Sequence, residues 1–355
     1  VLFRSAGITT AYIGAINDGP ISGARNRIIN GAQIVNQRAA SVTSTGYVTD
    51  RFQYQGAQNS KGTAQQSTTA PAFFTNSLQF TSSSAYTVLS TDYFALQQVI
   101  EGYNIADLAW GTSSAKPITL SFQVYSSLTG SFGGSLINGT NTRSYPFLYS
   151  ISSANTWTSI SITIPGDTTG TWATDNTAGM KVWFGLGAGS TYSGTANSWS
   201  GSLFLQPTGT VSVVGTNGAT FYITGVQLEA GTVATPFERR SYGQELALCQ
   251  RYFERHNYGT NEYTGASGFA LTGGTHYFSY SFRVPKRATP TYSASGTFRG
   301  QGLADTADST TYSFASTSNT STALLLAGVF SGTNGQAVNL QARAANTYID
   351  ASIEL

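Results

Sequence analysis

The stretch ITLSFQVY, residues 118–125, alternates apolar side chains with mostly polar ones at every second position. Successive side chains of an extended chain point to opposite faces, so this period predicts a β-strand with one face in a hydrophobic core. The same period recurs in SISITI at 159–164, VWFGL at 182–186, HYFSYSFRV at 276–284 and YIDASIEL at 348–355. Many short strands without interleaved helices are typical of an all-β sandwich or jelly roll.

Glycine-containing pairs between these stretches predict tight turns. They are Gly133-Gly134, Asn138-Gly139 and Asn217-Gly218, and such pairs tolerate the backbone angles that hairpin turns require.

One segment, residues 236–256, departs from the period of two. Apolar side chains there recur at intervals of four, three and four, in Tyr242, Leu246, Cys249 and Phe253, which indicates one face of a helix. Ser241 with a glutamine three positions later is typical of a capping box at a helix start. Cys249, the single cysteine, is interpreted as a small apolar core residue rather than a reactive thiol.

These patterns divide the chain into four parts. We expect an N-terminal segment at 1–25, a jelly-roll β-sandwich at 26–235, a short linker α-helix at 236–256 and a smaller C-terminal β-sandwich domain at 257–355. The opening VLFRS, residues 1–5, resembles the translation of a sequencing-adapter end. This suggests that these residues are not native and that an upstream attachment segment is missing.

Composition argues against several classes of protein. Only 10% of residues are charged and the net charge is +2, while 20 Tyr, 20 Phe and 5 Trp argue against disorder. Basic residues cluster no further than the pairs Arg239-Arg240 and Lys286-Arg287, so a nucleic-acid partner is not expected. No apolar run reaches the roughly 18–20 residues that span a bilayer, so membrane insertion is not expected.

Catalytic chemistry finds little support, and we expect no enzyme and no catalytic residue. The two histidines lie 20 positions apart, and no Gly-x-Ser-x-Gly motif leads into a helix. Glycosidases need two facing carboxylates, but the acids of the jelly roll, Glu101, Asp107, Asp167 and Asp175, cannot be paired from sequence.

No cofactor is expected. Zinc would need three or four His or Cys ligands, which this chain does not offer close together. Calcium, which needs only oxygen ligands, is the one alternative, near Asp167, Asp175 and Asn176. We favour the interpretation that these residues hold their own turns through Asx hydrogen bonds.

Sugar recognition would use aromatic faces together with amide and carboxylate groups. The ligand-binding candidates are Trp110, Trp172, Trp199 and Tyr192, of which Trp172 and Trp199 lie in loops rich in Gly, Ser and Thr. Trp183 is also considered, because it lies opposite in phase to Val182 and Phe184. For each tryptophan, packing in a core or an interface remains the favoured alternative.

Four stretches carry a family resemblance. They are NRIINGA at 26–32 continuing to Gln37-Arg38, then Gln98 to Phe122 with LAWGT at 108–112, Thr158 to Asp175, and ITGVQLE at 223–229 followed by ATPFE at 234–238 and ELALCQRY at 245–252. Together they resemble the tail-fibre or receptor-binding structural proteins of tailed bacteriophages. The resemblance implies a jelly roll similar to a carbohydrate-binding module, a virion location and adhesion.

The last of these stretches runs from the final jelly-roll strand into the helix. We interpret its residues as hydrogen-bonded or ion-paired supports of that corner rather than as ligand-binding groups. The residues are Gln227, Glu229, Phe237, Glu238, Arg239, Glu245, Cys249 and Arg251.

The sequence therefore favours a phage virion fibre protein that displays a binding site for a host-surface glycan. Its expected partners are two further copies of itself in a homotrimer, other virion proteins and the host glycan, on the phage tail or capsid exterior. One alternative is a structural head-fibre or capsid-decoration protein without a receptor role. Another is a polysaccharide depolymerase, which the lack of a 20–50-residue repeat disfavours.

Overall fold

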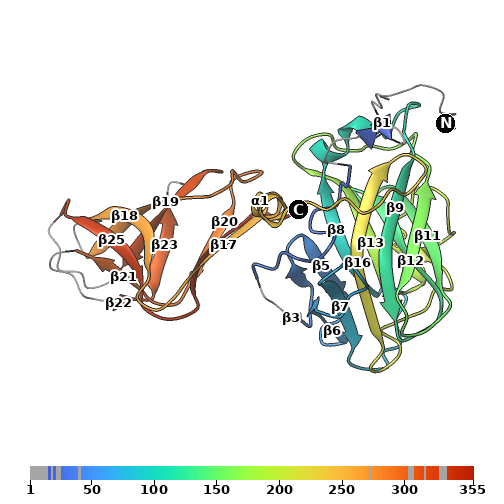
Figure 1. Ribbon diagram of the computed structural model, residues 1–355, viewed down its shortest axis with the longest axis horizontal. Helices are drawn as coiled ribbons and strands as arrows, with labels where there is room; N and C mark the ends of the chain where they lie inside the picture. Colours follow the sequence, from blue (N-terminus) through green and yellow to red (C-terminus); the bar gives the residue numbers. More distant parts are fainter. Residues whose placement is uncertain are drawn as a thin grey trace, which may run out of the picture. The chain divides into compact units, whose positions relative to one another are not determined.

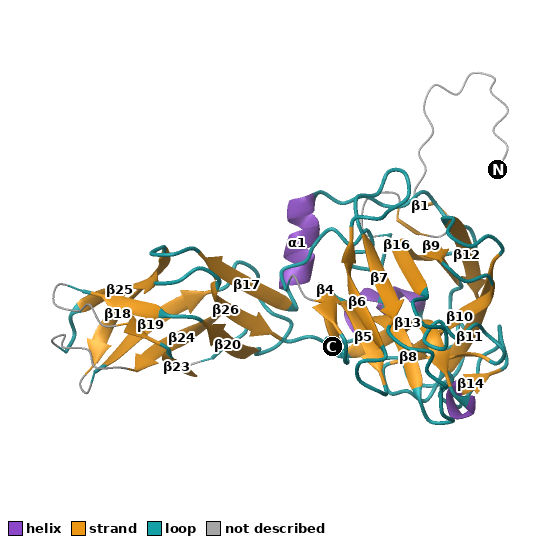
Figure 2. Ribbon diagram, turned by 90° about the horizontal axis from the view of Figure 1, so that it is seen from below, coloured by secondary structure: helices purple, strands orange, loops and turns teal. Residues whose placement is uncertain are grey.

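The computed structural model describes residues 15–16, 19–20, 25–38, 41–271, 274–302, 308–315, 317–327 and 334–355. Residues 1–5, interpreted above as adapter-derived, lie outside this part. The chain forms two compact units: unit 1 is Val1–Ile34 with Ala40–Arg240, and unit 2 is Val35–Ala39 with Ser241–Leu355. Strands are the main regular secondary structure of both units (Figure 2).

Unit 1, drawn from blue to yellow in Figure 1, is built from two six-stranded antiparallel sheets. Sheet A has the order β11-β10-β13-β8-β5-β4, and sheet B has the order β12-β9-β16-β7-β6-β3. The strands of sheet A are β4 (Gly46–Thr49), β5 (Phe52–Gly56), β8 (Tyr93–Glu101), β10 (Gly130–Asn138), β11 (Ser144–Ile151) and β13 (Ala178–Ala188). Those of sheet B are β3 (Ser41–Val42), β6 (Gly62–Ser67), β7 (Ser77–Ser82), β9 (Ile118–Ser126), β12 (Thr158–Ile164) and β16 (Thr220–Ala230).

Short elements complete unit 1. They are the strand pairs β1 (Ala15–Ile16) with β2 (Gly19–Pro20) and β14 (Ser193–Gly194) with β15 (Gln206–Pro207), and the 3-10 turns η1 (Gly102–Asn104), η2 (Ala106–Leu108) and η3 (Ser190–Tyr192).

The chain crosses repeatedly from one sheet to the other, from β8 in sheet A to β9 in sheet B, back to β10 and β11, then to β12, β13 and β16. This is the connectivity of a jelly roll. The period of two explains which side chains lie between the sheets, since Leu120, Phe122 and Val124 of β9 are all buried there. The predicted all-β jelly-roll sandwich is confirmed.

Two of the three predicted turns are confirmed and one is not, since Asn217-Gly218 lies in a turn before β16. Asn138-Gly139 does begin the connection between the paired strands β10 and β11. The Gly133-Gly134 pair, predicted as a turn, lies instead inside β10. A β-carbon on Gly134 would lie 1.9 Å from the carbonyl oxygen of Trp183 on the neighbouring strand, so glycine is needed there for close strand packing.

Unit 2 begins with the helix α1 (Tyr242–Gln250) and continues as a smaller β-sandwich. A three-stranded sheet has the order β17-β26-β20, and a seven-stranded sheet has the order β22-β21-β25-β18-β19-β24-β23. The strands are β17 (Phe253–Tyr258), β18 (Tyr263–Leu271), β19 (Thr275–Ser281), β20 (Thr291–Ser295), β21 (Phe298–Gln301), β22 (Asp308–Ser309), β23 (Thr311–Ala315), β24 (Ser321–Ala327), β25 (Ala337–Ala342) and β26 (Thr347–Ser352). Side chains from both sheets, such as Ile349 and Leu324, share one core.

The helix is shorter than the predicted range of 236–256. It begins after Ser241, whose Oγ accepts a hydrogen bond from the Gln244 N–H at 3.4 Å, as the capping pattern indicates. Cys249 is buried, as expected, but Tyr242 is 58% exposed. Phe253 already belongs to β17 and pairs with Ser352, because ladder hydrogen bonds to β26 replace the helix from there on. Within the described residues, no helix has the length and apolarity needed to cross a membrane.

Candidate functional site

The outward face of sheet A presents one row of side chains from four neighbouring strands. Strand register aligns Ser135 of β10 with Trp183 of β13, Trp183 with Gln97 of β8, and Gln97 with Gln53 of β5. Val182 and Phe184 point into the core, so the side chain of Trp183 between them lies on the opposite face.

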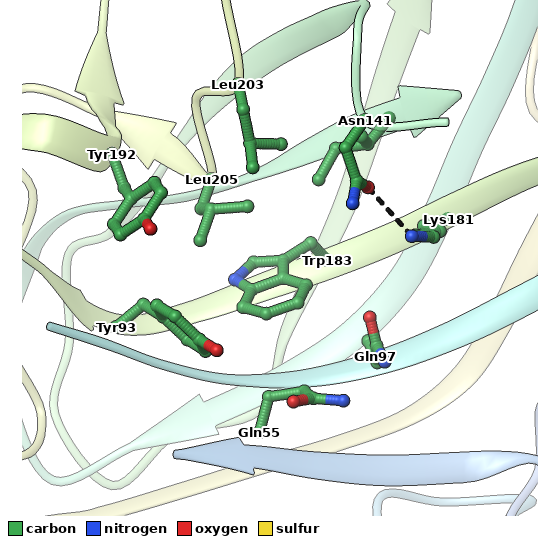
Figure 3. Close-up of a pocket in the computed structure, with 10 residues that line it drawn as sticks. Gln55, Tyr93, Gln97, Asn141, Lys181, Trp183, Tyr192, Leu203 and Leu205 are labelled. Atoms are coloured by element: carbon green, nitrogen blue, oxygen red, sulfur yellow. Dashed lines mark hydrogen bonds between the residues drawn. The ribbon is translucent and has the colours of Figure 1, made fainter. Parts of the chain in front are cut away.

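A hollow of about 230 Å³ opens on this face, with Trp183 at its centre (Figure 3). Strand residues contribute most of the lining. The segment between β13 and β15 supplies Tyr192, Leu203 and Leu205, and the Leu205 N–H holds this segment together by donating to the Tyr192 carbonyl at 2.8 Å. The full lining is Gln55, Tyr93, Gln97, Ile137, Asn141, Lys181, Trp183, Tyr192, Leu203 and Leu205.

Three aromatic rings meet in the hollow. Tyr93 packs edge-on against Trp183 with ring centroids 5.8 Å apart, and against Tyr192 at 5.4 Å. Trp183 is 6% exposed, whereas the two tyrosines are half-buried walls. Among the described residues, no protein acceptor receives the indole N–H of Trp183, and Figure 3 shows this nitrogen on the side of the two tyrosines.

Gln55 and Gln97 form the polar side of the hollow, and Gln53, which does not line it, bonds to both. Gln53 Oε1 accepts hydrogen bonds from Gln97 Nε2 and from Gln55 Nε2, both at 2.8 Å. Gln97 is only 6% exposed, and its Oε1 atom has no hydrogen-bond partner in the described part of the chain. An unpaired buried acceptor costs roughly 1–3 kcal/mol, so this oxygen is a ready acceptor for a ligand hydroxyl.

Among the described residues, Lys181 is the charged side chain that lines the hollow. Lys181 Nζ donates to Asn141 Oδ1 at 2.7 Å, drawn as the dashed line in Figure 3. Burial lowers the pKa of Lys181 from its usual value. The described lining residues include no aspartate or glutamate, so this part of the hollow combines a positive charge with neutral acceptors and aromatic rings.

Of the four predicted ligand-binding residues, only Tyr192 lines this hollow. Trp110, Trp172 and Trp199 form a cluster of their own, with ring centroids 4.6, 5.4 and 5.7 Å apart. Trp110 and Trp172 are 6% and 7% exposed, and their N–H groups donate to the carbonyls of Lys116 and Thr169. Trp110 and Trp172 therefore pack in the interior, as the alternative interpretation held, because edge-to-face contacts with neighbouring rings cover them. Trp199 is half-buried and donates to the Pro165 carbonyl at 2.9 Å.

The acids considered for calcium are engaged within the protein. Asp167 accepts two hydrogen bonds from the guanidinium of Arg143, at 2.7 and 2.8 Å, and a third from the Thr169 N–H. Asp175 Oδ1 accepts from the N–H and hydroxyl of Thr177, two residues on. These bonds confirm the Asx-turn interpretation. The described residues contain no group of three or more His, Cys, Asp or Glu side chains that could hold a metal ion.

The corner after β16 is held by a hydrogen-bond network in unit 1. Buried Gln227 donates to Glu229 Oε1 at 2.9 Å and accepts from the Glu238 N–H at 2.7 Å. Glu229 also accepts two hydrogen bonds from Thr235. Glu238 pairs with Arg240 at 3.4 Å. These contacts agree with the supporting role inferred for this motif.

The other residues of this motif follow Gln227 and Glu229 along the chain, partly in unit 1 and partly in unit 2. The guanidinium of Arg239 lies over the rings of Phe74 and Phe237, at 4.8 and 5.8 Å. In unit 2, Glu245 and Cys249 are buried in α1, and the Arg251 carbonyl accepts from the Arg287 N–H at 3.1 Å.

The lining residues that sequence reasoning missed include Tyr93, Gln97 and Lys181. Trp183, which the sequence analysis did consider, carried a local signal, the phase opposite to its buried neighbours in a strand. The others come from separate strands, and nothing in the sequence indicates that β8 pairs with β13.

No family model matches this chain, and no curated protein matches it. Solved structures resemble it at low identity. A Bacteroides thetaiotaomicron structure titled as a candidate sugar-binding protein is 14% identical over 58% of this chain and 99% of that chain, with a TM-score of 0.33. The CBM22-1 xylan-binding domain of a Paenibacillus barcinonensis protein is 9% identical over 55% and 96%, with a TM-score of 0.27.

A family 11 carbohydrate-binding module from Clostridium thermocellum, solved with a β-1,3-1,4-mixed-linked tetrasaccharide, is 14% identical over 52% of this chain and 91% of that chain. Its TM-score is 0.26.

Proposed function

We propose that unit 1 binds a glycan in the hollow on the outward face of sheet A. The observation that carries this proposal is the combination, in one hollow, of three aromatic rings with a buried unpaired amide oxygen, Gln97 Oε1. A sugar ring has an apolar C–H face and a polar rim of hydroxyl groups, so it matches a site that offers both surfaces.

Each part of the hollow has a role in this proposal. Tyr93 and Tyr192 provide partly exposed ring surface for C–H groups, and Trp183 closes the floor. Gln97 Oε1 accepts from a sugar hydroxyl, while the Trp183 N–H donates to a sugar oxygen. A volume of about 230 Å³ is below the roughly 300–1,000 Å³ of drug-sized ligand pockets, which favours one or two sugar rings over a long chain.

The test is a bacterial glycan array followed by calorimetric titration of the glycans that bind. Tyr192→Ala and Tyr93→Ala should each weaken binding by about tenfold, since one ring contact contributes about 1–1.5 kcal/mol. Tyr103→Ala, at an exposed tyrosine in η1 that does not line the hollow, is the matched control and should bind as the unmodified protein does. Unchanged affinity in both hollow variants, or no glycan bound by the unmodified protein, would contradict the proposal.

The proposal is one of binding without catalysis. It is supported by the described residues that line the hollow, among which there is no pair of carboxylates of the kind that glycosidases use. New reducing ends released from a bound glycan would contradict this part.

The finer part of the proposal is a phage virion fibre whose partners are copies of itself, other virion proteins and a host-surface glycan. Its support is the sequence resemblance of residues 26–38, 98–122, 158–175 and 223–252 to tail-fibre proteins. A trimeric state in solution is the first consequence of this part.

A further inference from the structure

The hollow holds a positive charge that the protein does not neutralise. Lys181 Nζ lies in the lining of the hollow and bonds Asn141 Oδ1, a neutral amide oxygen. No carboxylate among the described residues forms an ion pair with this ammonium group, and burial is the cause that lowers its pKa. An ammonium group has three N–H donors, so two remain for other acceptors.

The same hollow also needs a donor from its ligand. Gln97 Oε1 is buried and unpaired, and it can only accept. A ligand that satisfies the hollow therefore brings a hydroxyl for Gln97 and an acceptor for Lys181. Neutral sugars supply both groups, but only an anionic acceptor also offsets the cost of holding an ammonium group partly out of water.

We propose that the hollow selects sugars that carry an anionic substituent, with the substituent placed at Lys181 and a ring hydroxyl at Gln97. This inference rests on the proposed glycan-binding function and narrows it to acidic glycans, such as those with uronate, sialate or sulfate groups. Charge-assisted hydrogen bonds to a carboxylate or sulfate are about twice as strong as neutral ones.

Asn141 acts as a positioning residue in this arrangement. It lies in the connection between β10 and β11, at a backbone φ of 61°, and its side-chain oxygen holds the ammonium group of Lys181. The Asn141 amide is neutral and takes up one N–H donor of the ammonium group, so it does not neutralise the charge that an anion would meet.

The experiment compares matched acidic and neutral glycans on the full chain. The probes are trigalacturonate against its methyl ester, sialyllactose against lactose, and a sulfated galactose disaccharide against the unsulfated one. The unmodified protein should prefer at least one acidic member by about tenfold at low salt, and the preference should shrink as salt screens the charge.

Variants at position 181 distinguish the effect of the positive charge from the effect of the side-chain shape. Lys181→Gln should remove the acidic preference while neutral members still bind, and Lys181→Arg should keep it. Thermal unfolding of both variants verifies that they fold. Comparing the glycan pairs that differ by a carboxylate with the pair that differs by a sulfate shows which anionic group the hollow prefers.

The outcomes also separate the inference from the function it rests on. Equal binding of acidic and neutral members, or an acidic preference that survives in Lys181→Gln, overturns the acidic selectivity and leaves glycan binding intact. Absence of binding to every probe and to the array overturns both.

Discussion

At the scale of single residues, tryptophan side chains have different roles at different positions. Trp172 lies in a loop but is covered by Trp110 and Trp199, whereas Trp183 lies in a strand but reaches a hollow. Whether a ring can contact a ligand depends on which side chains pack over it. The position of a tryptophan in the sequence does not reveal those contacts.

The loop that carries Trp172 depends on one ion pair. Asp167 and Arg143 make a two-bond contact, and the Asp167 side chain is 2% exposed while that of Arg143 is 18% exposed. Burial opposes ionisation of Asp167, but the Arg143 contact and the Thr169 hydrogen bonds outweigh it and lower the pKa of Asp167.

We predict that Asp167→Asn lowers the free energy of unfolding by about 2–3 kcal/mol, because it leaves the Arg143 guanidinium without its counter-charge. Urea denaturation followed by tryptophan fluorescence measures this. Asp175→Asn, at an exposed acid that holds only its own turn, is the control and should cost much less. Equal effects of the two substitutions would contradict a special role for the Arg143 pair.

At the scale of elements, the end of α1 and the start of β17 depend on one buried carboxylate. Glu254 accepts hydrogen bonds from Lys286 Nζ at 2.5 Å, from the Arg283 N–H at 3.0 Å and from His256 Nε2. Lys286 Nζ also donates to the Gln250 carbonyl in the last residue of the helix, at 2.6 Å. The helix end and the strand are therefore joined through a single network.

This network makes the stability of unit 2 depend on pH. Burial alone would raise the pKa of Glu254, but the hydrogen bonds from His256, Lys286 and Arg283 outweigh it and lower the pKa from 4.5 to about 2. A carboxyl group whose pKa is lower in the folded than in the unfolded state stabilises the folded protein. This contribution is complete at pH values above the unfolded-state pKa. That contribution, on the order of 3 kcal/mol, is lost as the pH falls from about 4.5 through about 2.

We predict that Glu254→Gln destabilises unit 2 at neutral pH and that the difference from the unmodified protein narrows below about pH 4.5. Denaturation at a series of pH values from neutral to about pH 2 measures it. Glu262→Gln, at an exposed acid of the same unit, serves as the matched control. A difference that stays constant over this range would show that Glu254 does not supply the pH dependence.

At the scale of the whole molecule, each of the two units has a main hydrophobic core among the described residues. The core of unit 1 includes Phe122 and Phe184, and that of unit 2 includes Phe278 and Leu340. Unit 2 is the smaller of the two, and a core of about 100 residues gives modest stability alone. Large apolar side chains such as Tyr263 and Phe269 are 54% and 42% exposed in this unit.

From the fibre proposal we predict a homotrimer at micromolar concentration, in which burial of such surface between copies would add stability. Light scattering should give three times the mass of the chain. Antibodies against the protein should label the tail or capsid exterior of phage particles in electron micrographs. A monomer at this concentration would count strongly against the fibre proposal.

Sequence reasoning reached the fold class because its signals are local. A period of two places alternate side chains on opposite faces whatever the neighbouring strand is, so strands such as β9 and β19 could be predicted. The cap at Ser241 and the Asx turns at Asp167 and Asp175 also need only a few adjacent residues.

The end of the helix could not be predicted from local sequence signals. The apolar intervals of Tyr242, Leu246, Cys249 and Phe253 continue past the last helical residue, but Phe253 pairs with β26, about 100 residues further along the chain. A long-range ladder thus decides where a locally plausible helix stops.

By itself, the sequence determined that this protein is an all-β sandwich with a short capped helix before a second, smaller β unit. Only the tertiary structure decided where a ligand could bind. Ser135, Trp183, Gln97 and Gln53 become neighbours through strand register, and side chains of the loop before β15 complete the hollow. Period and capping depend on neighbours in sequence, whereas a hollow depends on which distant strands pair and which face they share.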